Sequence, residues 1–306
     1  MDDHRGVLER VSAMLVDDFD VAGTATDGDA GVAQARRLDP DVIILDVNMP
    51  GLDGFQTIDA LREGGSTAPV VFLSMADDDD HIGEAFRRGG RGYVLKSRMA
   101  WELPAALDQV LLGRLFAPSL TSLPHQANGS GHAVHLHGDR ESFLNGLTAF
   151  FDRALRRGDA TCIIATEEVR EGLARRLRPL GWEMSGGTHK RCRVIDASDA
   201  LSSFMRNGRP DGGVLAEITA ELEQYRHATT EDASSRLTIF GNMVEVLIAD
   251  GNAEGAIALE ALWNTVTHGL PFFTLCAYPA ACFRDDGQDL WRRVCAEHQA
   301  LVPQAA

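Results

Sequence analysis

The segment Asp41-Val-Ile-Ile-Leu-Asp46-Val-Asn-Met-Pro50-Gly-Leu-Asp-Gly54 decides the fold of the first half of the chain. Its apolar residues 42–45 are typical of a strand that is buried on both faces, as in a parallel sheet. The strand ends at Asp46, and a loop rich in Pro and Gly follows at once. Ligands bind at the carboxyl ends of the strands in open parallel α/β sheets, so this segment favours a functional Asp46. An Asp that only caps a turn is the alternative.

The composition allows two domains of ordinary size, because the chain has 306 residues, of which 44% are hydrophobic. The net charge of -16 argues against non-specific binding to nucleic acid or to an anionic membrane surface. No apolar run approaches the roughly 20 residues of a membrane span, and the acidic start is not typical of a signal peptide. Five cysteines without a CxxC pair indicate reduced thiols, so we expect a cytoplasmic protein.

Strands and helices alternate along the first half. The expected strands cover residues 20–25, 42–46, 69–74 and 92–96. The expected helices cover residues 4–15, 29–38, 55–62, a segment from about 77–80 to 88, and 100–112. This alternation predicts an α/β fold with a doubly wound parallel sheet.

Three of these strands end in polar residues, Asp46, Ser74 and Lys96. Adjacent parallel strands bring their ends to one edge of the sheet, where Asp2 and Asp3 precede the first helix. A carboxylate such as Asp46 can attack a phosphoryl group. An ammonium and a hydroxyl beside it can bind the phosphoryl oxygens. The residues therefore predict a phosphoacceptor site.

Oxygen ligands at the same edge predict a cofactor as well. Carboxylates are ligands that Mg²⁺ prefers, and a loop carbonyl can complete the set. We expect Mg²⁺ to be held by Asp2, Asp3, Asp46 and the backbone carbonyl of Asn48.

The first half resembles the receiver domain of two-component response regulators, over residues 1–116. The segments that carry this resemblance are Asp2-Asp3, Asp46, Met49–Gly54, Ser74–Ala76 and Gly92–Lys96. Residues 88–97, 113–114 and 117–120 are similar to the NarL/LuxR-type subgroup. The resemblance implies a flavodoxin-like fold and phosphotransfer to Asp46 from a sensor histidine kinase. It also implies that Ser74 and Tyr93 form a switch pair and that the domain is not an enzyme.

The chain departs from that pattern at its start. Receivers of this kind have an apolar strand directly before the acidic pair, whereas Met1 stands directly before Asp2 here. Because the missing strand is central in the order 2-1-3-4-5, we expect unpaired backbone and an open core. A natural start upstream is one explanation. A crippled receiver, or another segment in the gap, is the alternative, and metal ligands so near a terminus would be poor ones.

Residues 117–131 are predicted to be a linker, and the second domain, 132–306, is again α/β. The expected strands cover residues 132–137, 161–166, 192–196, 236–241 and 272–278. The expected helices cover residues 141–157, 167–177, 214–226, 253–267 and 288–300. No Walker A loop occurs, and no basic recognition helix follows residue 131, so neither nucleotide hydrolysis nor DNA binding is expected.

Several residues of the second domain are candidates for a site. His132, His135 and His137 are close in sequence, but no carboxylate or thiol at ligand spacing supports a metal there. Cys276 with Cys282 is rejected in the same way. Glu260 and Trp263 share a helix face that could line a pocket, although core packing is the alternative.

The second domain resembles the MEDS domain, the methanogen/methylotroph sensory domain, over residues 131–284. The segments that carry this resemblance are 132–141, 164–168, 240–244, 259–264 and 275–279. It implies a RecA-like fold without a working phosphate loop and a sensory role, with a small organic ligand. The candidate ligand pocket consists of His135, Glu260, Trp263 and Tyr278. Asn242 stands where the family commonly carries Glu.

These observations predict two doubly wound parallel-sheet domains and a response regulator whose output is not a DNA-binding domain. The expected partners are a sensor histidine kinase, a small organic ligand and a second copy in a homodimer, with no direct nucleic acid and no membrane. The alternative is a ligand-sensing repressor or scaffold with a degenerate receiver. An enzyme is the least favoured class, since only Glu167, Glu168 and Glu260 are loose candidates.

Overall fold

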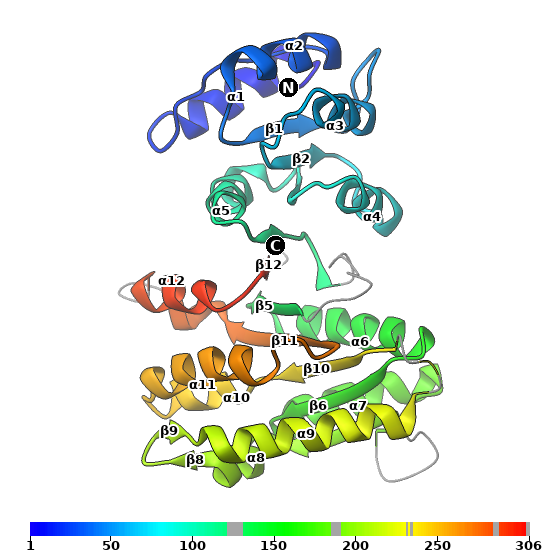
Figure 1. Cartoon of the computed structure of the whole chain (residues 1–306), viewed down its shortest axis with the longest axis vertical. Coiled ribbons are helices and arrows are strands. Elements are labelled where there is room, and N and C mark those ends of the chain that lie inside the picture. The colour runs from blue at the N-terminus through cyan, green and yellow to red at the C-terminus, as the bar shows by residue number, and fades with distance from the viewer. Residues whose placement is uncertain (121–130, 185–190, 231, 233–234, 284–287, 304–306) are drawn as a thin grey trace. The chain divides into compact units, whose positions relative to one another are not determined.

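The computed structural model describes residues 1–120, 131–184, 191–230, 232, 235–283 and 288–303. The chain divides into two compact units, Met1–Pro118 and Ser119–Ala305, and each is an α/β unit with a parallel sheet (Figure 1). Residues 121–130 of the predicted linker lie outside the described residues.

The sheet of the first unit has four strands that neighbour one another in chain order. They are β1 (Ile43–Asp46), β2 (Val70–Ser74), β3 (Gly92–Leu95) and β4 (Leu115–Phe116), and all pairs are parallel. The helices are α1 (Arg5–Leu15), α2 (Gly28–Leu38), α3 (Gly54–Glu63), α4 (Asp79–Arg87) and α5 (Met99–Leu111). Helix α5 lies on one side of this sheet, and α3 and α4 lie on the other (Figure 1).

Local sequence explains where three of these helices, α2, α3 and α4, begin. The side chains of Asp27, Asp53 and Asp78 each accept a hydrogen bond from a backbone N–H in the first turn of α2, α3 and α4. At α3 the Gln56 side chain also bonds back to the N–H of Asp53, which completes a capping box. Helix α3 therefore starts directly after the loop that follows Asp46.

The predicted strand at residues 20–25 is wrong, because the structure has no strand there. The backbone of Met1 and Asp2 lies between this segment and β1. The N–H of Asp2 donates to Ala25 O at 3.1 Å, and that of Asp46 donates to Met1 O at 2.9 Å. Residues 21–24 are exposed, and Thr24 O accepts from the side chain of Gln34 at 2.9 Å instead of from a neighbouring strand. A strand needs a ladder, and two residues do not supply one.

The second unit contains a six-stranded parallel sheet in the order β12-β5-β11-β10-β6-β7. Its strands are β5 (Gly131–His137), β6 (Ala160–Ala165), β7 (Cys192–Asp196), β10 (Leu237–Gly241), β11 (Phe272–Pro279) and β12 (Ala300–Val302). A separate antiparallel hairpin joins β8 (Met205–Arg206) to β9 (Arg209–Pro210).

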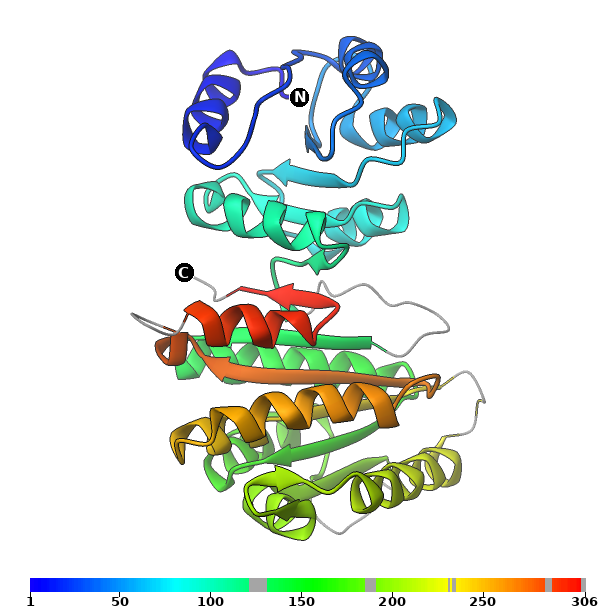
Figure 2. The same ribbon diagram turned by 60° about the vertical axis from the view of Figure 1, so that its left-hand side comes forward.

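Helices cover both faces of this second sheet. They are α6 (Arg140–Arg156), α7 (Glu167–Leu177), α8 (Ala197–Phe204), α9 (Gly212–Thr229), α10 (Met243–Ala249), α11 (Ala253–Val266) and α12 (Gln288–Ala296). Helices α11 and α12 lie on one face, and α6 lies on the other (Figure 2).

The end of the second unit differs from the prediction. Helix α12 stops at Ala296, whereas the sequence pattern predicted a helix up to residue 300. The apolar residues Ala300–Val302 instead pair with β5 as strand β12 and are buried. Pairing with a sheet neighbour outweighs the weak helical signal of so short an apolar run.

Candidate functional site

Asp46 lies at the carboxyl end of β1, and only 2% of its surface is exposed. The Nζ atom of Lys96, which directly follows β3, donates to Asp46 Oδ2 at 2.8 Å. The N–H of Asn48 donates to Asp46 Oδ1 at 3.3 Å. Parallel pairing of β1, β2 and β3 aligns the strand ends, so the two charged groups meet above β2.

Asp2, in the segment before α1, also contacts the ammonium of Lys96. Lys96 Nζ lies 2.8 Å from Asp2 Oδ2, and Asp2 Oδ1 accepts a bond from the N–H of His4 at 3.0 Å. Asp3 Oδ1 lies 2.8 Å from His4 Nδ1. One ammonium therefore faces two buried carboxylates, with a third carboxylate nearby.

This donor set fits Mg²⁺. The carboxylates of Asp2 and Asp46 meet at one edge of the sheet, and hard oxygens of this kind suit a divalent cation such as Mg²⁺. Asp2, Asp3 and His4 also bring one ligand atom each within 4.8 Å of one another. Asn48 is exposed in the loop two residues after Asp46.

The ion pair sets the protonation of the two groups. Burial raises the pKa of Asp46, and the Lys96 ammonium opposes that rise only in part. Burial lowers the pKa of Lys96, but the carboxylates of Asp2 and Asp46 outweigh burial and leave it raised. Lys96 is therefore held in its charged form.

Ser74 and Tyr93 meet at one backbone residue. The N–H of Ala76 donates to Ser74 Oγ at 3.1 Å, and the Tyr93 hydroxyl donates to Ala76 O at 2.8 Å. Both side chains are fully buried. The structure thus connects the predicted switch residues through Ala76.

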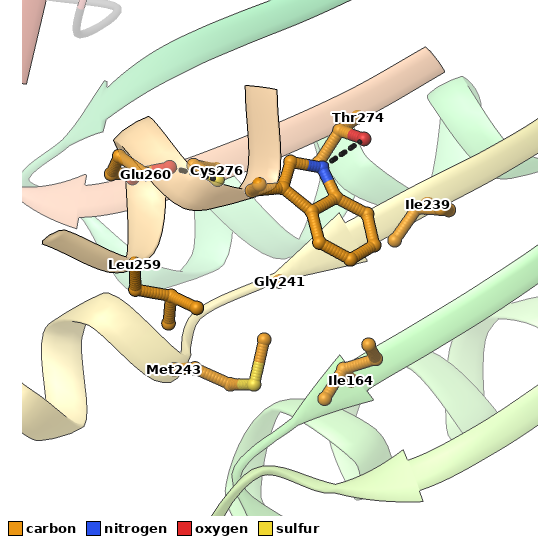
Figure 3. Close-up of a pocket in the computed structure, with 9 residues that line it drawn as sticks. Ile164, Ile239, Gly241, Met243, Leu259, Glu260, Thr274 and Cys276 are labelled. Atoms are coloured by element: carbon orange, nitrogen blue, oxygen red, sulfur yellow. Dashed lines mark hydrogen bonds between the residues drawn. The ribbon is translucent and has the colours of Figure 1, made fainter. Parts of the chain in front are cut away.

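A small pocket lies in the second unit between α11 and the sheet, with a volume of about 30 Å³. Its lining is mostly apolar and consists of Ile164, Ile239, Gly241, Met243, Leu259, Glu260, Trp263, Thr274 and Cys276. In Figure 3, Glu260 and Cys276 lie next to each other at this pocket. Trp263 Nε1 donates to Thr274 Oγ1 at 2.9 Å, and this bond orients the indole.

The structure brings three of the four predicted pocket residues to this region. The Tyr278 hydroxyl donates to Glu260 Oε1 at 2.6 Å, while Glu260 and Trp263 line the pocket. His135 is not among them, because its ring stacks on Phe143 of α6 with centroids 5.7 Å apart. Burial lowers the pKa of His135 to about 3. His135 is therefore neutral, and it lies on the face of the sheet that α6 covers, opposite the pocket.

Asn242 has a structural position at the end of β10. Its Oδ1 accepts from the N–H of Thr166 at 3.1 Å, and its Nδ2 donates to Glu245 Oε2 at 3.1 Å. The side chain is buried and ties the end of β10 to the end of β6.

Three further residues lie near Glu260: His132, Cys276 and His298. The sequence pattern groups His132 with His135 and His137, and Cys276 with Cys282, and does not predict that any of the three meets Glu260. The alternation of side chains along a strand already separates His132 from His135 and His137. No sequence signal indicated that His298, which follows α12, reaches the same face.

Family comparisons agree with these two units. The response regulator receiver domain profile matches residues 1–108. The profile of the methanogen/methylotroph, DcmR sensory (MEDS) domain matches residues 131–299, which is more than half of the chain. The chain is a member of the MEDS family with an N-terminal response regulator receiver domain.

Relatives of the receiver domain include nitrate/nitrite response regulators. The nitrate/nitrite response regulator NarL of Escherichia coli K12 is 37% identical over 119 residues, which cover 38% of this chain and 54% of NarL. The nitrate/nitrite response regulator homolog of Haemophilus influenzae is 38% identical over 146 residues, 46% of this chain and 69% of the relative. This chain thus spans about half the length of E. coli NarL.

Solved structures are similar to the receiver domain as well. The receiver domain of the putative response regulator NarL from Mycobacterium tuberculosis is 32% identical, with a TM-score of 0.36, and covers 37% of this chain and 93% of that one. No helix in the described part of the chain is both long enough and apolar enough to cross a membrane.

Proposed function

We propose that this MEDS-family response regulator accepts a phosphoryl group on Asp46 from a sensor histidine kinase in the cytoplasm. The signal then passes through the MEDS domain rather than through a DNA-binding domain. The observation that supports this proposal best is the 2.8 Å contact between Lys96 Nζ and Asp46 Oδ2 at aligned strand ends.

The proposed transfer is a single displacement at phosphorus. A carboxylate oxygen of Asp46 forms a bond to phosphorus while the bond from phosphorus to the kinase histidine breaks. The leaving imidazole takes its proton from solvent. Lys96 stays charged and stabilises the phosphoryl oxygens, and the Ser74 hydroxyl at the neighbouring strand end can donate to one of them.

Receiver domains use Mg²⁺ for this phosphorylation. In this chain Asp2, Asp3, Asp46 and the carbonyl of Asn48 would hold the ion, which supplies positive charge to the phosphoryl oxygens when bound.

Ala76 supplies a physical link from Asp46 to the rest of the domain. If the Ser74 hydroxyl turns to the phosphoryl group, the N–H of Ala76 loses its acceptor, and Ala76 also holds the Tyr93 hydroxyl. Phosphorylation would therefore shift both bonds together, as in a two-state switch. The surface of the receiver domain near Ser74 and Tyr93 would change as a result. This change would alter homodimer formation or the contacts of the MEDS domain.

The MEDS domain is proposed to bind a small organic ligand in the pocket beside Glu260. A cavity of about 30 Å³ holds only a molecule of about two or three heavy atoms. The apolar lining favours an apolar body, and the buried carboxylate of Glu260 marks one polar end.

The test is labelling of the full chain with a small-molecule phosphodonor, with and without Mg²⁺. The protein with unaltered sequence, the parent protein, should acquire acid-labile phosphate, and the Asp46→Asn variant should acquire none. Asp41→Asn is the matched control, since Asp41 is an exposed carboxylate just before the same strand. Labelling that persists in Asp46→Asn would rule out Asp46 as the acceptor.

The second candidate function is a ligand-sensing scaffold or repressor with an inactive receiver. The segment 21–24 is exposed and forms no strand, which favours this candidate. A parent protein that remains unlabelled under all donor and Mg²⁺ conditions would support it.

A further inference from the structure

We propose that His132, Glu260, Cys276 and His298 bind one Zn²⁺ ion in the interior of the MEDS domain. The four residues come from β5, α11, β11 and the segment between α12 and β12. All four side chains are buried, and each places one ligand atom within 4.8 Å of the others. This site is separate from the phosphoacceptor site and does not depend on it.

The spacing of the donor atoms matches a tetrahedral zinc site. His132 Nε2 lies 3.2 Å from Cys276 Sγ and 3.3 Å from Glu260 Oε2. Cys276 Sγ lies 3.4 Å from Glu260 Oε2, and His298 Nε2 lies 3.6 Å from Glu260 Oε1. Zinc–ligand bonds of about 2.0–2.3 Å in a tetrahedron put neighbouring donors about 3.3–3.8 Å apart. The contacts among His132 Nε2, Cys276 Sγ and Glu260 Oε2 lie in or next to that range, and one ligand atom of His298 lies within 4.8 Å of one from each of the other residues.

Hydrogen bonds orient both imidazoles as metal ligands. His298 Nδ1 lies 2.7 Å from Val294 O, a carbonyl that can only accept, so Nδ1 carries the proton. His132 Nδ1 lies 2.8 Å from Asn264 Oδ1. The amide of Asn264 is fixed by its Nδ2, which donates to Glu297 O at 2.7 Å. A metal-bound histidine typically donates its other ring N–H to an oxygen in this way.

The carboxylate ligand has a supporting bond of the same kind. The Tyr278 hydroxyl donates to Glu260 Oε1 at 2.6 Å. The Nε2 atoms of His132 and His298 face the oxygens of Glu260, at 3.3 Å from Oε2 and 3.6 Å from Oε1. A cation bound to these nitrogens and to the carboxylate would stabilise the buried negative charge of Glu260.

Charge and ligand softness point to Zn²⁺ among the common cations. One thiolate and one carboxylate together neutralise a divalent ion, and two neutral imidazoles complete four ligands, so the occupied site carries no net buried charge. Thiolate and imidazole suit zinc, whereas Mg²⁺ and Ca²⁺ require oxygen ligands. Four protein ligands leave no open position, which is typical of a structural site.

The ion would connect parts of the chain that are far apart in sequence, since His132 and Cys276 are 144 residues apart. His298 would fix the segment between α12 and β12 onto the sheet. Glu260 and Cys276 also line the pocket, so a molecule in it would lie against two of the ligands (Figure 3).

The first experiment measures metal content in the full chain, purified without a chelator and with any affinity tag removed. We expect about one zinc per chain. Replacement of zinc by Co²⁺ should produce a thiolate-to-cobalt charge-transfer band and the strong visible bands of tetrahedral cobalt. The group Asp2, Asp3 and His4 contains no thiol, so cobalt bound there gives no such charge-transfer band.

Matched variants assign the ligands. Cys276→Ala and His298→Ala should lose the zinc, and Cys276→Ala should lose the charge-transfer band. Cys162→Ala removes another buried thiol, on β6, and should keep both signals, as should His135→Ala. A zinc-selective chelator should lower the melting temperature of parent protein but not that of Cys276→Ala.

The proposal is overturned if parent protein contains no zinc and takes up no cobalt with thiolate character. In that case the contacts of Cys276 with His132 and Glu260 hold the cluster together without a metal. Zinc that is retained in Cys276→Ala at the parental level, without a cobalt–thiolate band in parent protein, would equally contradict it. The parent measurements decide the question even if a variant fails to fold.

Discussion

Lys96 holds its ammonium nitrogen 2.8 Å from Oδ2 of Asp46, across the intervening strand β2. The same nitrogen lies 2.8 Å from Asp2 Oδ2. Lys96 therefore stabilises two buried carboxylates whose charges would otherwise repel each other, and it stands where the charge of a phosphoryl group would develop.

Replacing Lys96 by Ala should slow phosphorylation of Asp46. Loss of the ammonium removes the counter-charge, so the pKa of Asp46 should rise further and its nucleophilic form should become rarer. The labelling rate should fall by at least about tenfold, as when one charge-stabilising donor is lost. The measurement is the initial rate with a small-molecule phosphodonor, with the exposed Arg87→Ala as control. Parental rates in Lys96→Ala would contradict this role.

Glu102 should make the stability of the receiver domain depend on pH. Burial raises the pKa of this carboxyl from 4.5 to about 7, although Arg98 lies 3.6 Å away. The folded state thus binds the proton more tightly than the unfolded state. The contribution of protonated Glu102 to the free energy of unfolding is complete below pH 4.5 and is lost as the pH rises through about 7.

Glu102→Gln removes this dependence, because the amide stays neutral. The variant should match parent protein near pH 5. Near pH 8 it should melt at a higher temperature, and its unfolding free energy should be higher by on the order of 1–3 kcal/mol. Thermal unfolding across this pH range is the measurement, and the exposed Glu63→Gln serves as control. A variant that is less stable than parent at pH 8 would show that Glu102 is ionised and well paired.

Tyr93→Phe should leave phosphorylation of Asp46 intact but abolish the conformational change that follows it. The variant loses the bond from the hydroxyl to Ala76 O, which costs on the order of 1 kcal/mol, but it keeps Asp46, Lys96 and Ser74. Labelling should continue at near the parental rate. Phosphorylation should no longer change hydrogen exchange outside the segment around Ala76. An unaltered exchange response would remove Tyr93 from the switch.

Trp263 and Thr274 should be energetically coupled. Trp263→Phe or Thr274→Val leaves one buried partner of the 2.9 Å bond unsatisfied, at a cost of about 1–3 kcal/mol each. In the double variant the two costs should not add. A double-mutant cycle by denaturant unfolding measures this coupling, and strict additivity would argue that the bond contributes little.

The receiver site was predictable because its residues lie at strand ends. Once Val42–Leu45 is recognised as a buried parallel strand, Asp46, Ser74 and Lys96 must reach one edge. The absence of a strand at residues 20–25 was not predictable in the same way. This segment has strand-like residues, but a strand also needs a neighbour to pair with, and of the described residues only Asp2 donates a backbone bond to it, at Ala25.

The buried cluster of the MEDS domain could not be found from local spacing. Its residues lie on four elements, and His132 meets Cys276 only because β5 and β11 are neighbours. His298 was assigned to the helix predicted for residues 288–300, although α12 ends at Ala296 and His298 precedes β12. The order of strands in a sheet follows from tertiary packing, which a sequence pattern does not specify.

Direct mapping of the phosphorylated residue tests the central claim. The full chain is treated with a phosphodonor and Mg²⁺, the acyl phosphate is reduced with borohydride, and the peptides are identified by mass spectrometry. The account predicts modification at Asp46 alone, and only when Mg²⁺ is present. Modification at another carboxylate, or none at Asp46 under conditions that saturate Mg²⁺, would contradict it.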